Sequence, residues 1–152
     1  MLGRSAPTNA APDVDALQSR IVVFVREFGL HRPDLTPCGV PVSISQAHAL
    51  TELAAMGSLT QSELGSALRL SKSTVSRLVG QLEEHGWVER DRGQPDDGRV
   101  VRLRLTVAGT RVSGRVAKAR RARMARLLER IPEPDRGAVL RALNILVEAA
   151  HD

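Results

Sequence analysis

The sequence predicts a mainly α-helical chain that carries one small β-hairpin. Apolar residues recur at steps of three and four over most of its 152 residues, which is the spacing of amphipathic helices. Strand-like runs are confined to 87–91 and 100–105, on either side of the turn-rich segment RGQPDDGR. The length suits one compact unit, and residues 1–12, which contain no sustained apolar run, are expected to form a disordered tail.

Two helices are predicted before residue 57. The first spans 13–29 and ends at Gly29, and the segment 30–42, which has three prolines, is expected to be a connecting loop. The second begins at Ser43 or Ser45. The buried stripes predicted for the two helices are Val14, Leu17, Ile21, Val25 and Phe28, and then Ala47, Leu50, Leu53 and Ala54.

Two short helices are predicted in tandem after this. Thr60 and Glu63 form a capping box, in which each side chain satisfies the backbone amide of the other. This helix ends near Leu68, and Ser71 is the N-cap of the next, which runs to about His85. Its inward positions are Val75, Leu78, Val79 and Leu82, and its outward face is small and polar, with Ser73, Ser76, Arg77 and Gly80.

The last two predicted helices span 107–131 and 133–150, with Thr106 as the first N-cap and Pro132 between them. Residues 107–131 hold 8 Lys/Arg and 1 Asp/Glu, whereas 60–106 hold 8 and 7. The net charge of +5 favours a polyanionic partner. The basic helix is a solvated face, a set of salt bridges to a partner chain, or a place where Arg111 and Arg115 meet phosphate.

The composition favours duplex DNA over other partners. Aromatic residues make up only 2% of the chain, so the stacking platforms that bind single strands are not expected. No nucleophile and base pair or G-x-G-x-x-G loop is evident, which argues against an enzyme. A module that binds only proteins would carry an apolar or acidic outer face on the helix after Ser71, and the predicted outer face of this helix is neither. With no membrane-length apolar run and one cysteine, Cys38, a cytoplasmic location is expected.

The tandem helices predict how DNA would be contacted. A hydroxyl-rich helix start at 71–74 suits the major groove, with Arg77 one turn further on. Arg92 and Arg99 at the hairpin tip suit a narrow minor groove, with Asp97 orienting Arg99. The full set of predicted DNA-binding residues is Thr60, Gln61, Ser71, Lys72, Ser73, Thr74, Ser76, Arg77, Arg90, Arg92, Asp97 and Arg99.

The motifs STVSRLV, LEEHGWVER and DGR followed by LT resemble the core of the MarR family of transcriptional regulators. The resemblance implies a winged helix-turn-helix over 43–106, flanked by dimerisation segments at 13–42 and 107–152. It also implies a homodimeric, sequence-specific regulator of double-stranded DNA, and a repressor released by an unidentified small molecule. Gly80 and Gln81 depart from the family, where an acidic and a basic residue are common, as does Gly98, where Arg is common.

An alternative is a regulator of the same fold that senses a metal or an oxidant through Cys38. His31 and His48 could accompany it, but a tetrahedral metal site needs three or four donors. Relatives that sense zinc have histidines at the start of the fifth helix, where this chain has none, and those that sense peroxides use tyrosines, which it lacks. We therefore expect no metal site and no cofactor, and Cys38 to be an ordinary loop cysteine.

Overall fold

The computed structural model describes residues 10–91 and 100–151, and within them it confirms a mainly α-helical fold with a small antiparallel sheet. Residues 10–12 belong to the first helix, which corrects the predicted tail over 1–12, because alanines favour helices and Pro12 is tolerated in a first turn. The elements are α1 Ala10–Phe28, α2 Ile44–Met56, β1 Leu59–Thr60, α3 Gln61–Ala67, α4 Lys72–Glu84, β2 Val88–Asp91, β3 Arg102–Leu105, α5 Val107–Glu129 and α6 Glu133–Ala149.

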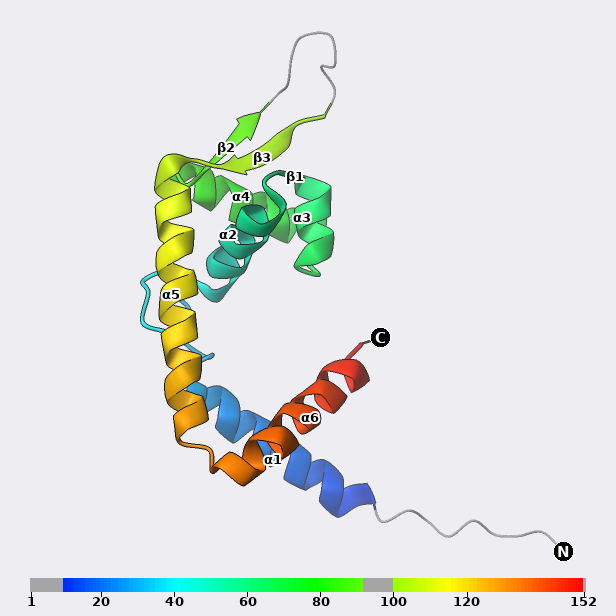
Figure 1. Ribbon diagram of the computed structural model, residues 1–152. Helices are drawn as coiled ribbons and strands as arrows, with labels where there is room; N and C mark the ends of the chain where they lie inside the picture. Colours follow the sequence, from blue (N-terminus) through cyan, green and yellow to red (C-terminus); the bar gives the residue numbers. More distant parts are fainter. Residues whose placement is uncertain (1–9, 92–99, 152) are drawn as a thin grey trace, which may run out of the picture.

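The elements divide into two groups joined by the long helix α5 (Figure 1). Helices α2, α3 and α4 lie on one side of the first half of α5 and the strands lie across its start, while α1 and α6 lie at its other end. The strands are ordered β1-β3-β2, and β2 and β3 pair with Val88 opposite Leu105. We call the β2–β3 hairpin the wing. The two-residue strand β1, which pairs Leu59 with Leu103, was not predicted.

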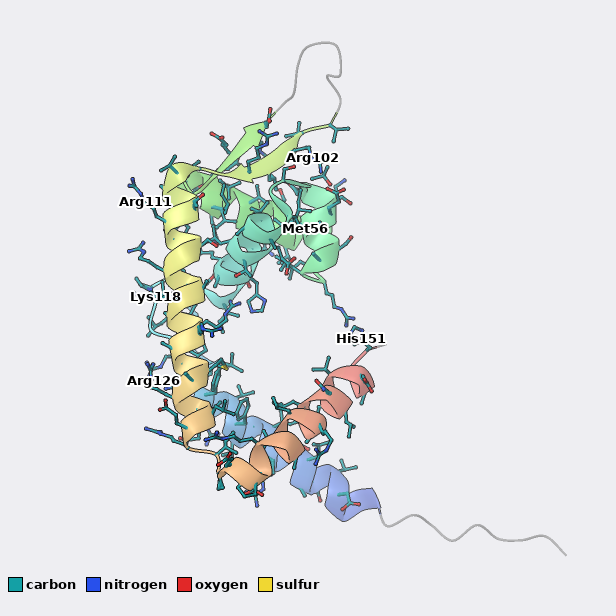
Figure 2. The ribbon with its side chains drawn as sticks, viewed as in Figure 1. Met56, Arg102, Arg111, Lys118, Arg126 and His151 are labelled. Atoms are coloured by element: carbon teal, nitrogen blue, oxygen red, sulfur yellow. The ribbon has the colours of Figure 1, made fainter. Side chains whose placement is uncertain are left out.

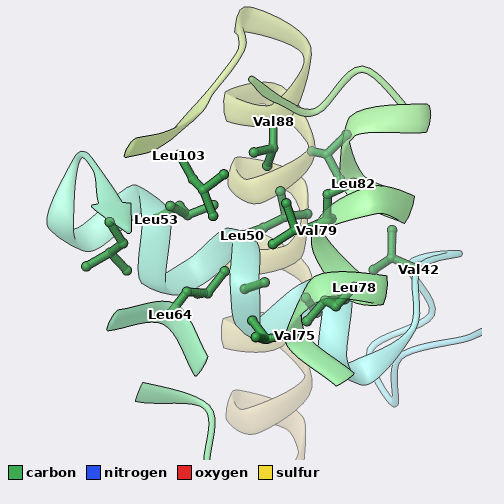
Figure 3. Close-up of a cluster of buried hydrophobic side chains, with 14 of the residues drawn as sticks. Val42, Leu50, Leu53, Leu64, Val75, Leu78, Val79, Leu82, Val88 and Leu103 are labelled. Atoms are coloured by element: carbon green, nitrogen blue, oxygen red, sulfur yellow. The ribbon is translucent and has the colours of Figure 1, made fainter. Parts of the chain in front are cut away.

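The hydrophobic core lies between α2, α4, the sheet and the first half of α5 (Figure 3). Burying each large aliphatic side chain there contributes about 2 kcal/mol. On α2 the buried face includes Ala49 but not Ala54, which is exposed and corrects the predicted stripe. The face is turned because α2 packs along α5, where the Ser113 hydroxyl donates to the Leu50 carbonyl over 3.3 Å. The largest fully buried side chains are Leu50, Leu53, Leu64, Leu82, Leu103, Val79 and Val116.

Side-chain caps fix where the helices begin. The capping box of Thr60 and Glu63 is confirmed, and Ser43 forms a second one with Gln46. At the start of α5 the Thr106 hydroxyl accepts from the amide of Gly109 at 3.0 Å and donates to the carbonyl of Gly86 at 2.6 Å. The same hydroxyl therefore ties the end of the α4 segment to the start of α5.

The terminal helices leave their apolar side chains uncovered. Leu17 of α1 is 49% exposed, and Val147 of α6 is 59% exposed. The predicted burial of the first helix's stripe is therefore not achieved within one chain at Val14, Leu17 and Ile21, whereas Val25 and Phe28 are half-buried. Other large apolar residues exposed on the two helices are Val22, Val23, Phe24, Val139, Leu140, Leu143, Ile145 and Leu146.

Candidate nucleic-acid interface

The N-terminal turn of α4 presents hydroxyl groups around a free helix start. Ser71 is the N-cap, and its hydroxyl oxygen accepts from the amide of Thr74 at 3.3 Å. The same oxygen lies 2.9 Å from the Thr74 hydroxyl and 3.2 Å from that of Ser73. The first turn of α4 contains no acidic residue, so its positive dipole end is not neutralised. This end of α4 is suited to a phosphate or another anion.

The outer face of α4 agrees with the sequence prediction. Lys72, Ser73, Ser76 and Arg77 are exposed, while the inward positions lie in the core. Neither Lys72 nor Arg77 forms an ion pair within residues 10–91 and 100–151. Their charges are therefore available to an outside partner.

Helices α3 and α4 meet through a tight turn. Arg69 has a φ of 53°, and the amide of Leu70 donates to the Gly65 carbonyl at 2.9 Å. A Cβ on Gly65 would lie 3.2 Å from Cγ1 of Val75, so glycine allows the two helices to pack closely. A groove of about 560 Å³ between the helices is lined by polar and basic side chains, among them Gln61, Ser62, Ser66, Arg69 and Lys72.

The wing is held against α4 by an ion pair. Arg90 on β2 donates to both carboxylate oxygens of Glu83, with Nε to Oε1 at 2.8 Å and Nη2 to Oε2 at 3.1 Å. Across the wing, Nη2 of Arg104 lies 3.1 Å from the carboxylate of Asp91. These two pairs orient the base of the hairpin. The predicted tip residues Arg92, Asp97 and Arg99 lie outside the described residues.

A third arginine, Arg102, joins the wing to the start of α3 (Figure 2). Its Nε donates to the Ser58 hydroxyl at 3.0 Å, and its Nη2 lies 3.8 Å from the carboxylate of Glu63. The backbone N–H of Thr60 donates to that carboxylate at 2.7 Å, and this bond, with the Thr60 side chain, lowers the pKa of Glu63. The hydroxyl and the amide of Thr60 are thus both engaged within the chain, and its carbonyl accepts the first hydrogen bond of α3.

The start of α5 packs directly on the base of the wing. A Cβ on Gly109 would lie 1.9 Å from the carbonyl oxygen of Trp87, so only glycine fits there. Further along α5, the cationic side chains of Arg111, Lys118 and Arg126 project away from the body of the molecule (Figure 2). Within the described residues none of these three forms an ion pair, so their charges face solvent or an outside partner.

A cleft of about 130 Å³ lies where α1, α2, α5 and the loop after α1 meet. Its walls are partly apolar. Thr36, His48, Arg120 and Arg123 supply polar or charged side chains, and no carboxylate from the described residues lines it. Partial burial, followed in size by the charge of Arg120, lowers the pKa of His48. The cleft is therefore suited to a small molecule with an apolar body. Its apolar lining includes Phe28, Leu30, Ile44 and Met124.

Cys38 also lines this cleft, half-buried, with its sulfur 2.9 Å from the Thr36 hydroxyl oxygen. His48 shares the cleft with it, whereas His31 does not line it. In the part of the chain that the structure describes, no three His, Cys, Asp or Glu side chains gather as a metal ion would require.

Among the described residues no helix has the length and apolar run needed to cross a membrane.

Of the predicted contact residues, those described lie at the start of α3, over the N-cap and first half of α4, and at Arg90 near the end of β2. Sequence reasoning missed Arg69 and Arg102. The left-handed turn at Arg69 could not be foreseen, because arginine, unlike glycine or asparagine, does not signal a positive φ. Arg102 could have been found, because it alternates with Leu103 in a predicted strand and its side chain should therefore point outward.

The model of the MarR family matches residues 39–100, from the loop before α2 to just before β3. An HTH-type transcriptional regulator of Mycobacterium leprae, named as uncharacterised, is 35% identical over 111 residues, covering 71% of this chain and 75% of that protein. The chain belongs to the MarR family. An HTH-type transcriptional regulator of Mycobacterium tuberculosis is also 35% identical, over 74% of this chain and 77% of its own length.

Solved structures agree with this assignment. A MarR family protein from Bacillus stearothermophilus matches 97% of this chain and 100% of its own, with 26% identity and a TM-score of 0.67. FabT of Streptococcus pneumoniae, solved in complex with DNA, covers 91% of this chain and 92% of its own, with 21% identity and a TM-score of 0.64. This MarR protein is therefore a DNA-binding transcriptional regulator, in a family of regulators rather than enzymes.

Proposed function

We propose that this MarR protein is a homodimeric repressor that binds a specific duplex operator through α4 and is released by a small molecule. The observation that supports contact through α4 is its outer face, where Lys72, Ser73, Ser76 and Arg77 are exposed and the two cations lack an ion-pair partner among the described residues. A helix with such a face fits the major groove, where arginine forks onto guanine or grips a phosphate.

The neighbouring predicted residues would position the helix on the duplex. Ser71 and Thr74 lie at the dipole end of α4, and Gln61 lines the same groove as Lys72, so these groups suit phosphates on either side of the major groove. Arg90 already pairs with Glu83, which directs its guanidinium from the wing toward the last turn of α4. Arg92, Asp97 and Arg99 stay predicted minor-groove contacts. Thr60 would act on DNA binding indirectly, because as the N-cap of α3 it fixes where that helix begins.

A second copy of the chain would cover α1 and α6. Their exposed apolar side chains form a surface that a lone soluble chain does not normally present to water. A twofold dimer also places two copies of α4 on two half-sites about one helical turn of DNA apart, which is about 34–36 Å. Occupying such an operator would repress transcription by excluding the polymerase.

The cleft near Cys38 would hold the effector. It lies between α1 on one side and α2, which belongs to the DNA-binding group of helices, on the other. A ligand that fits only one spacing of the two α4 helices would therefore shift the dimer toward that spacing. Sensing through the thiol of Cys38 is the second candidate, since the sulfur is half-buried beside a hydroxyl in the same cleft.

Selection of duplexes from a random-sequence pool at fixed salt tests the proposal. We expect one enriched sequence with two inverted half-sites, bound by a dimer. Enrichment of no sequence above the starting pool would contradict specific DNA binding.

Treating the protein–DNA complex with an organic peroxide, for wild type and for Cys38→Ser, then separates the two kinds of effector. Release of DNA by the wild type alone supports sensing through the Cys38 thiol, and equal behaviour of the two proteins rejects it.

A further inference from the structure

The glycines inside the helices differ in what requires them. Gly65 is favoured by its close packing on the Val75 side chain, whereas Gly109 is required because a Cβ there would clash with the backbone carbonyl of Trp87. Among the residues that the structure describes, a Cβ on Gly80 would meet no atom within 4 Å, and the same holds for one on Gly114. Glycine in a helix interior costs stability relative to alanine, so the described part of the fold does not explain Gly80.

Gly80 lies on the face of α4 that the proposed function turns toward DNA. It follows Ser76 by four residues and Arg77 by three, which places it one turn further along the same face. Side chains on a helix lean toward its N-terminus, so the side chain that Gly80 lacks would have covered the surface beside Ser76 and Arg77. The absence of a Cβ leaves helix backbone exposed beside the two predicted contact residues.

The distance of Gly80 from the start of α4 matches the width of the major groove. Gly80 lies eight residues after Lys72, which is about 12 Å along the helix axis. The major groove is also about 12 Å wide. If the hydroxyl-rich start of α4 enters the groove, Gly80 reaches its sugar–phosphate wall.

We infer that Gly80 is a point of close approach between α4 and the sugar–phosphate backbone of the operator, where any side chain would hold the helix away. The inference rests on the proposed function, and it adds a residue whose role is the lack of a side chain. Glycine at this position is then kept at the expense of helix stability, because it lets Arg77 and Ser76 lie deeper in the groove.

The test compares Gly80→Ala with Gly114→Ala, which is the matched control. Gly114 is also inside a helix, with free space where a Cβ would lie, but it belongs to α5. Both variants should raise Tm by about 2–4 °C, since both relieve the same helix penalty. Affinity is measured by fluorescence anisotropy at fixed salt on the duplex that the wild type enriches most strongly from the random pool.

We expect Gly80→Ala to bind this duplex about tenfold more weakly than wild type, which corresponds to 1.4 kcal/mol, while Gly114→Ala binds as wild type does. A Gly80→Ala protein that gains stability and keeps full affinity would overturn the inference, and so would an equal loss of affinity in both variants. If the wild type itself enriches no duplex, the proposed function fails instead, so the two failures can be told apart.

Discussion

The guanidinium of Arg90 and the carboxylate of Glu83 form a two-pronged ion pair, with donor–acceptor distances of 2.8 and 3.1 Å. The pair joins the first strand of the wing to the last turn of α4. It uses Nε and Nη2, and no hydrogen bond to Nη1 is found within the described residues, so Nη1 can still reach a phosphate. The wing and the proposed recognition helix are therefore oriented by a shared contact.

The first prediction concerns this pair. Because both side chains are about a third exposed, Glu83→Gln should lower the free energy of unfolding by less than about 1 kcal/mol. Arg90→Ala should lose the same stability and also a phosphate contact, so it should bind DNA more weakly than Glu83→Gln. Chemical denaturation and anisotropy measure the two effects. Equal DNA affinities for the two variants would remove Arg90 from the proposed contacts.

Gly109 and Trp87 give a prediction about the fold alone. Gly109→Ala places a methyl group against the Trp87 carbonyl, which is part of the backbone and cannot rotate away, so we expect a loss of about 1–3 kcal/mol of stability. Urea unfolding of this variant beside Gly114→Ala is the measurement. Should Gly109→Ala be as stable as the control, the contact between α5 and the wing is looser than described.

The locally determined features were the ones that the sequence could predict. The Thr60–Glu63 capping box and the Ser71 cap depend on residues three positions apart, and both are confirmed. Strand β1 depends on Leu59 pairing with Leu103, 44 residues away, and two residues carry too little pattern to signal a strand. Ala54 fitted a helical stripe, but the packing of α2 on α5 selects a different face.

The site was predictable to a similar degree. The outer face of α4 follows from helical periodicity, so Ser76 and Arg77 were placed correctly on the surface. The pairing of Arg90 with Glu83 depends on how the wing folds back on α4, which no local pattern encodes. Likewise, the cleft that brings His48 beside Arg120 is formed by segments far apart in the chain.

His48 predicts a pH dependence of stability. Burial, and then the charge of Arg120, lowers its pKa below the ordinary 6.5, although Glu52 acts in the opposite direction. The unfolded chain then takes up the proton first, so stability is full above pH 6.5 and falls as the pH drops from there toward the lowered value. Tm measured from about pH 7.5 to about pH 5 should therefore fall less for His48→Gln than for wild type. Parallel curves for the two proteins would contradict this account.

The exposed apolar face of α1 predicts the effect of a charge on assembly. Leu17→Glu would bury a carboxylate in the proposed dimer interface, so the variant should be monomeric by light scattering and bind the operator poorly. Met56→Glu is the control, because Met56 is 64% exposed but lies at the end of α2 (Figure 2). A dimeric Leu17→Glu protein would show that α1 does not form the interface.

Arg77 tests the central claim that α4 binds the operator. Its side chain is exposed on the outer face of α4 and has no ion-pair partner among the described residues, so Arg77→Ala should leave Tm unchanged. Arg126→Ala removes the same charge from the far half of α5 and serves as the control (Figure 2).

The decisive measurement is the affinity of wild type, Arg77→Ala and Arg126→Ala for the selected operator duplex at one salt concentration. We predict that Arg77→Ala weakens binding by about 1–3 kcal/mol while Arg126→Ala binds within about 0.5 kcal/mol of wild type. Unchanged affinity of a folded Arg77→Ala protein, or an equal loss in both variants, would contradict operator binding through α4.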